Sequence, residues 1–387
     1  MDAHTYLQNF ALRNCLVEVN ESGELVPELA ESWDVSKDAR KWTFKIRSGI
    51  EFHNGKTLDA DDVVASINSH RGENSTSAVK LLANQITSIK GNGNVVEIEL
   101  ESGNADYVYL LSSPEFVILP AGDGTPDYVS DQGTGAYVLE NFEPGVNTVL
   151  KRNPNYWKSG AGNFESAEIL AVNDGTALIS GLNSRDLDVV NRVDPGLANK
   201  LSGLDHVDVV EYAGTLHYAF QMNTKSAPFD NNDVRLALKH GVDRESILSL
   251  VLSGHGSVGN DQPIGPANRY YNGDIPQRSF DPDKAAFHLK KAGLSSLDVS
   301  LFTSSGAFEG AVDAAVLLAE AEKKPESTWS SSDTRLTDTG AMYGSKNHGS
   351  QHGGVVGRRK IGCLLSVTPK APRGMTPTSP TTVLTSY

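Results

Sequence analysis

Apolar and polar side chains alternate strictly over residues 41–47, which read Lys-Trp-Thr-Phe-Lys-Ile-Arg. Such alternation is the period of a strand with one buried face, so we expect a half-buried strand there. The dipeptide Asn54-Gly55 predicts a turn soon after it. A second alternating stretch at 96–100 predicts another strand, and residues 140–152 predict a hairpin around Glu-Pro-Gly.

Helical spacing appears between these alternating stretches. Asp59 can cap a helix whose apolar residues Val63, Val64 and Ile67 share one face. Further helices are expected after Asp233 and Asp243 and over 283–292 and 311–324; further strands are expected over 187–190, 207–212, 216–222 and 297–302. Strands and helices therefore alternate along most of the chain, which predicts the α/β class.

The composition changes after Lys324. Residues 1–324 hold 27 basic and 45 acidic residues, whereas residues 325–387 hold 7 basic and 3 acidic ones. In the later stretch 32 of the 63 residues are Ser, Thr, Gly or Pro, and no apolar period persists. Such a segment buries too little apolar surface to offset the entropy of ordering. We expect little secondary structure and exposed side chains at Trp329, Leu364 and Leu365.

A shift of reading frame offers an explanation for this change. If each codon is read from its third base, residues 325–329 permit Ala-Gly-Ile-Asp-Leu and residues 341–343 permit Asp-Val-Trp. Residues 357–363 permit Arg-Pro-Thr-Glu-Asp-Trp-Met, and residues 371–376 permit Ala-Pro-Trp-Asn-Asp. We therefore hypothesise a one-base slip near codon 324, and the nucleotide sequence around that codon would test it.

Length and composition limit the class of protein. A chain of 387 residues has room for two or three domains and a sizeable core. A hydrophobic share of 39% fits a globular protein, and no apolar run approaches the ~18 residues of a membrane span. The net charge of −14 argues against a nucleic-acid partner. Cys15 and Cys363 show no metal-ligand spacing, and we expect no disulfide between them.

Signatures of enzymes are absent from the sequence. It contains no His-Glu-x-x-His motif, Walker A loop, Gly-x-Ser-x-Gly elbow or dinucleotide-binding glycine pattern. His348 and His352 are four residues apart but lie among glycines, so no metal site is expected. Asp61 and Asp62 are interpreted as solvated or capping carboxylates. We expect no catalytic residues, no metal and no cofactor.

Seven short phrases occur in a consistent order over about 300 residues. They are Val-Pro-Glu-Leu-Ala-Glu-Ser-Trp at 26–33, Trp-Thr-Phe-Lys-Ile-Arg at 42–47, Phe-His-Asn-Gly-Lys at 52–56 with Asp-Asp-Val at 61–63, Gly-Thr-Gly-Ala-Tyr at 133–137, Lys-Arg-Asn-Pro-Asn-Tyr-Trp at 151–157, Ala-Pro-Phe-Asp at 227–230 and Asp-Val-Arg-Leu-Ala-Leu at 233–238. Together they resemble the peptide- and nickel-binding family of extracellular solute-binding proteins, family 5, which serve ABC importers. The shifted-frame phrases after Lys324 resemble later phrases of the same family.

The resemblance implies a fold and a domain plan. The expected fold is α/β and periplasmic-binding-protein type II-like, with two lobes, an extra small domain and its C-terminal part missing. Residues 1–33 and 133–226 would form an incomplete large lobe, and residues 34–132 a small inserted domain. Residues 227–324 would form the first half of the second lobe, and residues 325–387 a disordered, out-of-frame tail. The aromatic residues of the phrases, such as Trp33, Trp42 and Trp157, are interpreted as core or hinge residues.

The same resemblance suggests residues that contact a ligand. In this family the cleft lies between two lobes that close on the solute. The segment at His4 and Thr5 is similar to one that contacts the ligand backbone in peptide binders. His217 and Tyr218 would lie on a strand that presents a tyrosine to the ligand. The Gly-rich loop 256–263 would offer Asn260 and Asp261; for all six residues, ordinary strand or loop packing is the alternative.

One departure from the family concerns charge. Peptide-binding relatives present an acidic residue to the α-amino group of the ligand, in the phrase that this chain would encode only out of frame. In its place residues 358–361 read Arg-Arg-Lys-Ile, which puts positive charge where a cationic amine would dock. The substitution weighs against binding of a peptide amine there.

The resemblance predicts a binding protein that performs no chemistry. It would act as a monomer, capture a small peptide or similar solute, and deliver it to an ABC permease in the membrane. Family members are periplasmic or extracellular, but residues 1–4 show no basic or apolar region of a secretory signal. Two alternatives stay open: a cytoplasmic α/β hydrolase or transferase, and a non-functional pseudogene product. The sequence does not name the solute.

Overall fold

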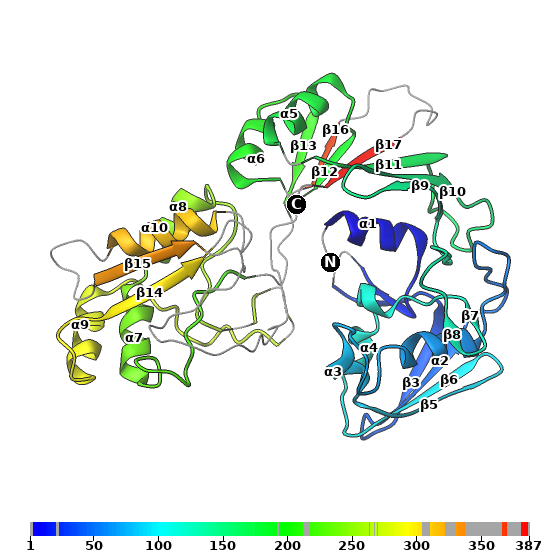
Figure 1. Cartoon of the computed structure of the whole chain (residues 1–387), viewed down its shortest axis with the longest axis horizontal. Coiled ribbons are helices and arrows are strands. Elements are labelled where there is room, and N and C mark those ends of the chain that lie inside the picture. The colour runs from blue at the N-terminus through cyan, green and yellow to red at the C-terminus, as the bar shows by residue number, and fades with distance from the viewer. Residues whose placement is uncertain are drawn as a thin grey trace. The chain divides into compact units, whose positions relative to one another are not determined.

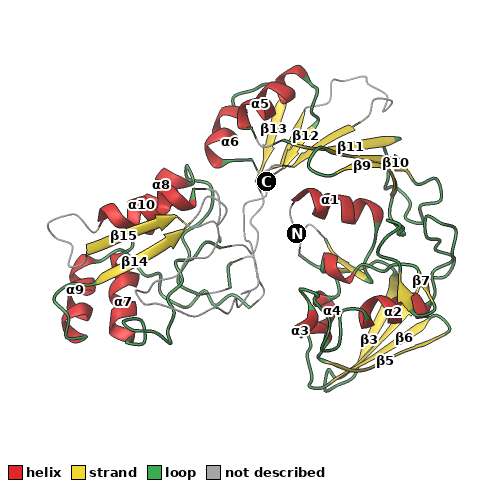
Figure 2. Ribbon diagram, viewed as in Figure 1, coloured by secondary structure: helices red, strands yellow, loops and turns green. Residues whose placement is uncertain are grey.

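A computed structural model provides the fold of the chain. It describes residues 3–20, 23–172, 174–191, 193–211, 217–262, 264–266, 268, 270–303, 310–321, 330–336, 366–369 and 381–385. The chain divides into two compact units: residues 1–191 with 368–387, and residues 192–367 (Figure 1). Helices and strands alternate in both units, which confirms the α/β class (Figure 2).

The first unit contains three groups of elements. The amino-terminal segment holds α1 (Ala3–Leu12), β1 (Val17–Val19) and β2 (Leu25–Pro27). The next group holds β3 (Ala30–Val35), β4 (Lys41–Ile46), α2 (Ala60–Asn68), α3 (Lys80–Ala83), β5 (Ile86–Asn92), β6 (Val95–Leu100), α4 (Tyr107–Leu110), a 3₁₀ turn (Pro114–Phe116), β7 (Ala121–Gly122) and β8 (Thr125–Pro126). The last holds β9 (Tyr137–Glu143), β10 (Asn147–Arg152), β11 (Ser166–Ala171), α5 (Gly175–Ser184), β12 (Val189–Asn191) and β17 (Thr381–Thr385).

An antiparallel four-stranded sheet in the order β3-β4-β6-β5 dominates the second group. The predicted alternating strand at 41–47 is β4, in which Trp42, Phe44 and Ile46 are buried. Its partner is β6, with Trp42 opposite Ile98 in the register. The strict alternation therefore predicted the correct strand and the correct buried face.

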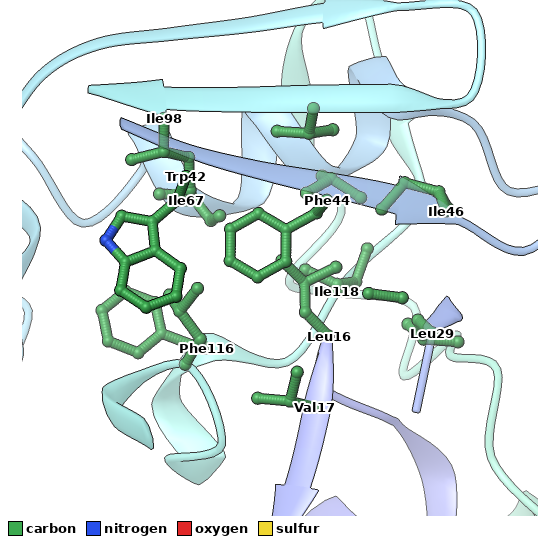
Figure 3. Packing of buried hydrophobic residues seen from close by; sticks show 14 of the residues in the cluster. Leu16, Val17, Leu29, Trp42, Phe44, Ile46, Ile67, Ile98, Phe116 and Ile118 are labelled. Atoms are coloured by element: carbon green, nitrogen blue, oxygen red, sulfur yellow. The ribbon is translucent and has the colours of Figure 1, made fainter. Parts of the chain in front are cut away.

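The buried face of this sheet contributes to an extensive hydrophobic core. Trp42 and Phe44 lie with their rings nearly parallel, 6.4 Å apart between centroids (Figure 3). Ile67 of α2 and Phe116 of the 3₁₀ turn pack in the same cluster. Leu16 and Leu29 also belong to it, so the amino-terminal segment shares this core. The predicted core role of Trp42 is confirmed.

Helix α2 begins with a capping box, as the carboxylate at Asp59 predicts. The side chain of Asp59 accepts a hydrogen bond from the Asp62 amide at 3.0 Å, and the Asp62 side chain accepts one from the Asp59 amide at 3.0 Å. Asp62 is fully buried and also accepts from the Ala121 amide at 2.7 Å. The helix start is therefore attached to β7, and the interpretation of Asp62 as a capping carboxylate is confirmed.

The third group forms a sheet in which β12, β17, β11, β10 and β9 lie side by side. β9 and β10 form the predicted hairpin, and β17 pairs in parallel with both β11 and β12. Helix α1 packs on this sheet through a small apolar cluster that includes Leu12, Leu150 and Ile169. This cluster places the amino-terminal segment against strands far along the chain.

The second unit holds α6 (Pro195–Leu201), β13 (Val207–Val210), α7 (Asn232–Gly241), α8 (Arg244–Val251), α9 (Pro282–Lys291), β14 (Asp298–Thr303), α10 (Ala311–Ala321) and β15 (Ser330–Leu336); β16 (Ser366–Pro369) spans the boundary between the units. A hydrophobic core of the second unit forms where α7 packs on α9. It contains Phe229, Val234 and Leu289, among others. Helix α8 buries none of its residues, and Phe287 of α9 is 61% exposed.

Two predicted features differ from the structure. The strand predicted for 216–222 is not formed in its described part, 217–222, which has no regular structure. Its alternating Tyr, Phe and Met resemble a strand, but no described strand pairs with it, and an unpaired strand leaves its main-chain groups unsatisfied. The expectation of little secondary structure after Lys324 is also wrong for three segments, because β15, β16 and β17 form there.

The strands after Lys324 have a simple physical origin. Main-chain pairing does not need an apolar period, and β17 reads Thr-Thr-Val-Leu-Thr, which is rich in β-branched residues. The frame-slip hypothesis stays a prediction, which the nucleotide sequence around codon 324 would test. Trp329, Leu364 and Leu365 lie outside the described residues, as do Cys363, the two histidines at 348 and 352, and residues 358–361.

The sheet bounds and the two compact units can be set beside the predicted domain boundaries. The sheet of the predicted inserted domain, 34–132, begins at Ala30. The two compact units separate at 191/192, whereas the predicted change of lobe lies at 226/227. The assignment of 1–33 and 133–226 to one large lobe and of 227–324 to the other stays a prediction.

Candidate ligand-binding residues and a buried polar network

His4 and Thr5 lie at the start of α1 and differ in exposure. His4 is buried, and its Nε2 lies 2.6 Å from the hydroxyl of Thr148 on β10. Its ring also lies near Phe142 of β9, with the centroids 6.2 Å apart. Thr5 is exposed. The contacts of His4 therefore hold α1 against the sheet, and Thr5 offers the accessible side chain of the pair.

His217 and Tyr218 lie in the irregular segment before α7. Both side chains are exposed, and Tyr218 is 42% exposed. The predicted strand is absent from this segment, so the tyrosine is not presented by a sheet. An exposed aromatic ring on an irregular segment can still contact a solute, because it offers a flat apolar surface with a terminal hydroxyl.

Asn260 and Asp261 connect the loop that follows α8 to neighbouring segments by hydrogen bonds and ion pairs. The Asn260 side chain donates to the carbonyls of Ile275 and Pro276 at 3.0 and 2.9 Å, and accepts from the Arg278 amide at 2.8 Å. Asp261 accepts from Arg244 at 2.8 Å and forms a second ion pair with Arg278. Its φ of 55° is left-handed. These bonds support a loop-closing role for both residues.

The six residues fall into two groups. His4 and Thr5 belong to the first unit, and His217, Tyr218, Asn260 and Asp261 belong to the second. Their convergence on one cleft between lobes stays a prediction. Within the second unit, the bonds of Asn260 and Asp261 leave His217 and Tyr218 as the more accessible candidates.

A buried polar network in the first unit was not predicted. Asn14, which follows α1, is 8% exposed and makes four side-chain hydrogen bonds. Its Oδ1 accepts from the Thr134 hydroxyl at 2.9 Å and from Nε1 of Trp157 at 3.4 Å. Its Nδ2 donates to Glu28 at 2.7 Å and to the Tyr156 hydroxyl at 3.5 Å. Asn14 therefore connects the segment after α1 with the segments at 28, 134 and 156–157.

Two carboxylates and one ammonium group extend this network. Nζ of Lys158 lies 2.8 Å from Glu28 and 2.8 Å from Glu18 of β1. Burial raises the pKa of Glu28 to about 7, against the hydrogen bond from Lys158, which lowers it. Burial also acts upward on Glu18, but its hydrogen bond from Lys158 leaves the pKa of Glu18 below its usual value.

A shallow polar hollow lies beside this network. It has a volume of about 500 Å³, and Arg47 and Trp157 line it together with the ion pair Glu31–Lys45. The guanidinium of Arg47 lies 5.3 Å from the ring centroid of Trp157, within the range of a cation–π interaction. Arg47 also donates to the Glu28 carbonyl at 2.6 Å. The hollow and the network are thus joined through Arg47 and Trp157.

The sequence contains little signal for this network. Glu28 stands in the phrase Val-Pro-Glu-Leu-Ala, where a single charge between apolar residues is the one visible anomaly. Its partners Asn14 and Lys158 are separated from it by 14 and 130 residues along the chain. Such distant pairs follow no local period, so pattern analysis could not connect them.

No group of three or more His, Cys, Asp or Glu residues in the described ranges is arranged to hold a metal ion. None of the helices in this part of the chain is both long enough and apolar enough to cross a membrane.

Comparison with known proteins places the chain in a family. The model of the bacterial extracellular solute-binding proteins, family 5 (Middle), matches residues 24–325. The chain belongs to this family, as its sequence phrases predict. Members of the family are solute-binding proteins rather than enzymes.

Three curated relatives illustrate the range of solutes. Heme-binding protein A of Haemophilus influenzae is 29% identical over 310 residues, which cover 72% of this chain and 56% of the relative. The dipeptide-binding protein of Escherichia coli is 26% identical, with 73% and 58% covered. The nickel-binding periplasmic protein of Escherichia coli is also 26% identical, with 72% and 55% covered. The chain thus spans little more than half the length of these relatives.

Solved structures share the fold. The binding protein AgaA of Agrobacterium tumefaciens, in complex with agropinic acid, superposes with a TM-score of 0.74 at 23% identity, covering 87% of this chain and 71% of that one. The ABC transporter-associated periplasmic binding protein DppA of Helicobacter pylori, in complex with the peptide STSA, gives 0.74 at 20% identity, covering 89% and 74%. The predicted periplasmic-binding-protein type II-like fold is confirmed.

Proposed function

We propose that this chain is the solute-binding protein of an ABC importer, that it captures a small peptide or similar solute by lobe closure, and that it delivers the solute to a membrane permease. The family match over residues 24–325 is the observation that carries this proposal. The relationship of the Helicobacter pylori structure to an ABC transporter supports the partner. Binding would take place outside the cytoplasm, by one chain, and without making or breaking a bond of the solute.

Peptides are the favoured solute class. Relatives named for dipeptides, di- or tripeptides and oligopeptides match this chain over similar lengths. Exposed Thr5 and Tyr218 supply hydroxyl groups and an aromatic surface, which suit a ligand with amide groups and a variable side chain. Relatives named for heme and nickel make these two solutes the competitors that a test has to include.

Titration calorimetry on the full chain tests the proposal. Alanyl-alanine, trialanine, haemin and a nickel–histidine complex are titrated separately, and mass spectrometry follows the peptides for hydrolysis. We expect saturable binding of one molecule of di- or tripeptide per chain and no loss of intact peptide. Hydrolysis would instead favour the alternative of an enzyme. A cooperatively folded chain that binds none of the four solutes would contradict the proposal.

Tyr218, the aromatic candidate for ligand contact, has a matched control residue, Tyr270, in the same unit. Tyr218→Ala is expected to weaken peptide binding about tenfold, because roughly 1.4 kcal/mol of ring contact is lost. Tyr270 is another exposed tyrosine of the second unit, 56% exposed, and Tyr270→Ala should leave the affinity unchanged. Equal losses for the two variants, or no loss for Tyr218→Ala, would remove Tyr218 from the site.

A further inference from the structure

Glu28 is a carboxylate enclosed by protein at the junction of β2 and β3. Its side chain is 5% exposed. One carboxylate oxygen accepts a hydrogen bond from the side-chain Nδ2 of Asn14 at 2.7 Å. The other accepts one from Nζ of Lys158 at 2.8 Å. Since water cannot solvate the group, its charge depends on these two donors.

The charge near Glu28 is not balanced. Lys158 lies 2.8 Å from both Glu18 and Glu28, so one ammonium group serves two carboxylates. Glu18 is 51% exposed and is solvated by water, whereas Glu28 is not. A negative charge therefore has a higher free energy on Glu28 than on Glu18. As the pH falls, Glu28 is the carboxylate of the pair that takes up a proton first.

The other titratable and charged groups around Glu28 do not remove this imbalance. Arg47, which follows β4, donates from Nε to the main-chain carbonyl of Glu28 at 2.6 Å, and its guanidinium lies over Trp157. Burial raises the pKa of the Cys15 thiol and of the Tyr156 phenol, so both groups are neutral at physiological pH. The charged groups at the Glu28 side chain are thus Glu18 and Lys158.

We propose that Glu28 is a proton switch that changes how the segment around Lys158 is held against β1 and β2. In the ionised state, Glu28 and Glu18 share Lys158. In the protonated state, Lys158 pairs with Glu18 alone, and the charge of the trio becomes zero. The switch lies at a meeting point of chain segments, because Asn14 connects Glu28 to Thr134 and Trp157.

The direction of the effect follows from linkage. Burial raises the pKa of Glu28 from 4.5 to about 7, so the folded chain holds a proton that the unfolded chain has lost. The stabilisation by this proton is fully present below pH 4.5 and is lost as the pH rises through about 7. Glu28 therefore makes the chain less stable at pH 8 than at pH 5.

Thermal unfolding of the full chain between pH 4.5 and 8.5 tests the switch, with tryptophan fluorescence as the readout. The difference between the wild-type and Glu28→Gln melting temperatures isolates Glu28, because other groups titrate equally in both. The glutamine side chain mimics the protonated state, so we expect the variant to gain stability over wild type as the pH rises from 4.5 to about 7, and to gain little more above that. Glu99→Gln, an exposed glutamate of β6, is the matched control and should give no such difference.

Glu18→Gln separates a proton switch from a merely structural role. It removes the competing carboxylate and leaves Lys158 to Glu28 alone, so the midpoint of the Glu28 transition should move to lower pH. Lys158→Met should move it to higher pH. A midpoint that neither variant moves would overturn the proposal. So would a Glu28→Gln chain that fails to fold at pH 8, because the neutral side chain is expected to be tolerated better than the carboxylate there.

Discussion

Gly133 and Gly135 lie against the main chain at the end of α1. A Cβ atom on Gly133 would lie 2.0 Å from the carbonyl oxygen of Leu12, and one on Gly135 would lie 2.3 Å from the carbonyl carbon of Leu12. Both neighbours are backbone atoms, which cannot move aside as a flexible side chain can. The two glycines therefore allow the phrase Gly-Thr-Gly to approach the segment that carries Asn14.

Substitution of Gly135 by alanine tests this close approach. We expect Gly135→Ala to lower the free energy of unfolding by about 1–3 kcal/mol, because the added methyl group forces the backbone apart. Urea unfolding monitored by circular dichroism measures the change. Gly122→Ala is the control, since a Cβ there would meet nothing within 4 Å. An effect at Gly122 as large as that at Gly135 would contradict the argument.

Helix α2 depends on local bonds at its first turn and on a distant bond to β7. Asp59 and Asp62 exchange side-chain and main-chain hydrogen bonds, and Asp62 also pairs with Lys56 at 2.5 Å. The helix start, its cap and its buried face were all visible in the sequence. The bond from Asp62 to the Ala121 amide was not, because it joins residues 59 positions apart.

Alanine substitutions in this turn separate the two kinds of bond. Asp59→Ala removes the cap and should cost about 0.5–2 kcal/mol of stability. Asp62→Ala should cost more, because it leaves the buried amide of Ala121 without its acceptor and the ammonium of Lys56 with only one of its two carboxylates, Asp59. Asp61→Ala is the control in the same turn, since Asp61 is exposed and should change the stability little. Urea unfolding of the three variants measures the loss of unfolding free energy for each. If Asp61→Ala caused the largest loss, the expected ranking of Asp62, Asp59 and Asp61 would be refuted.

At the scale of the whole molecule, the last residues of the chain enter a sheet built from its middle. β17 lies between β11 and β12 and pairs with Ile169 and Leu170 through Val383 and Leu384. A central strand satisfies main-chain groups on both sides, so its loss would expose hydrogen-bonding edges on both neighbours. The family match ends at residue 325, so this strand lies beyond the part shared with the family model.

Hydrogen exchange on the intact chain tests the pairing of β17. The amides of 381–385 should exchange at least about tenfold more slowly than those of the loop 158–163, because opening a doubly paired strand costs more than ~1.4 kcal/mol. Equal exchange in the two segments would contradict the strand and favour the frame-slip hypothesis. Sequencing of the nucleotides around codon 324 tests that hypothesis independently.

The sequence by itself determined the α/β class, the family and most of the elements before Lys324, because alternation, helical spacing and capping residues act over a few neighbouring positions. β4 and the start of α2 are examples. It failed at 217–222, where an alternating pattern has no described strand to pair with, and in β17, where main-chain pairing needs no pattern. Only the tertiary structure showed that His4 is bound to Thr148 and that Asn260 and Asp261 brace a loop. It alone connected Asn14, Glu28 and Lys158, because burial and charge sharing arise between residues that lie 14 and 130 positions apart in the chain.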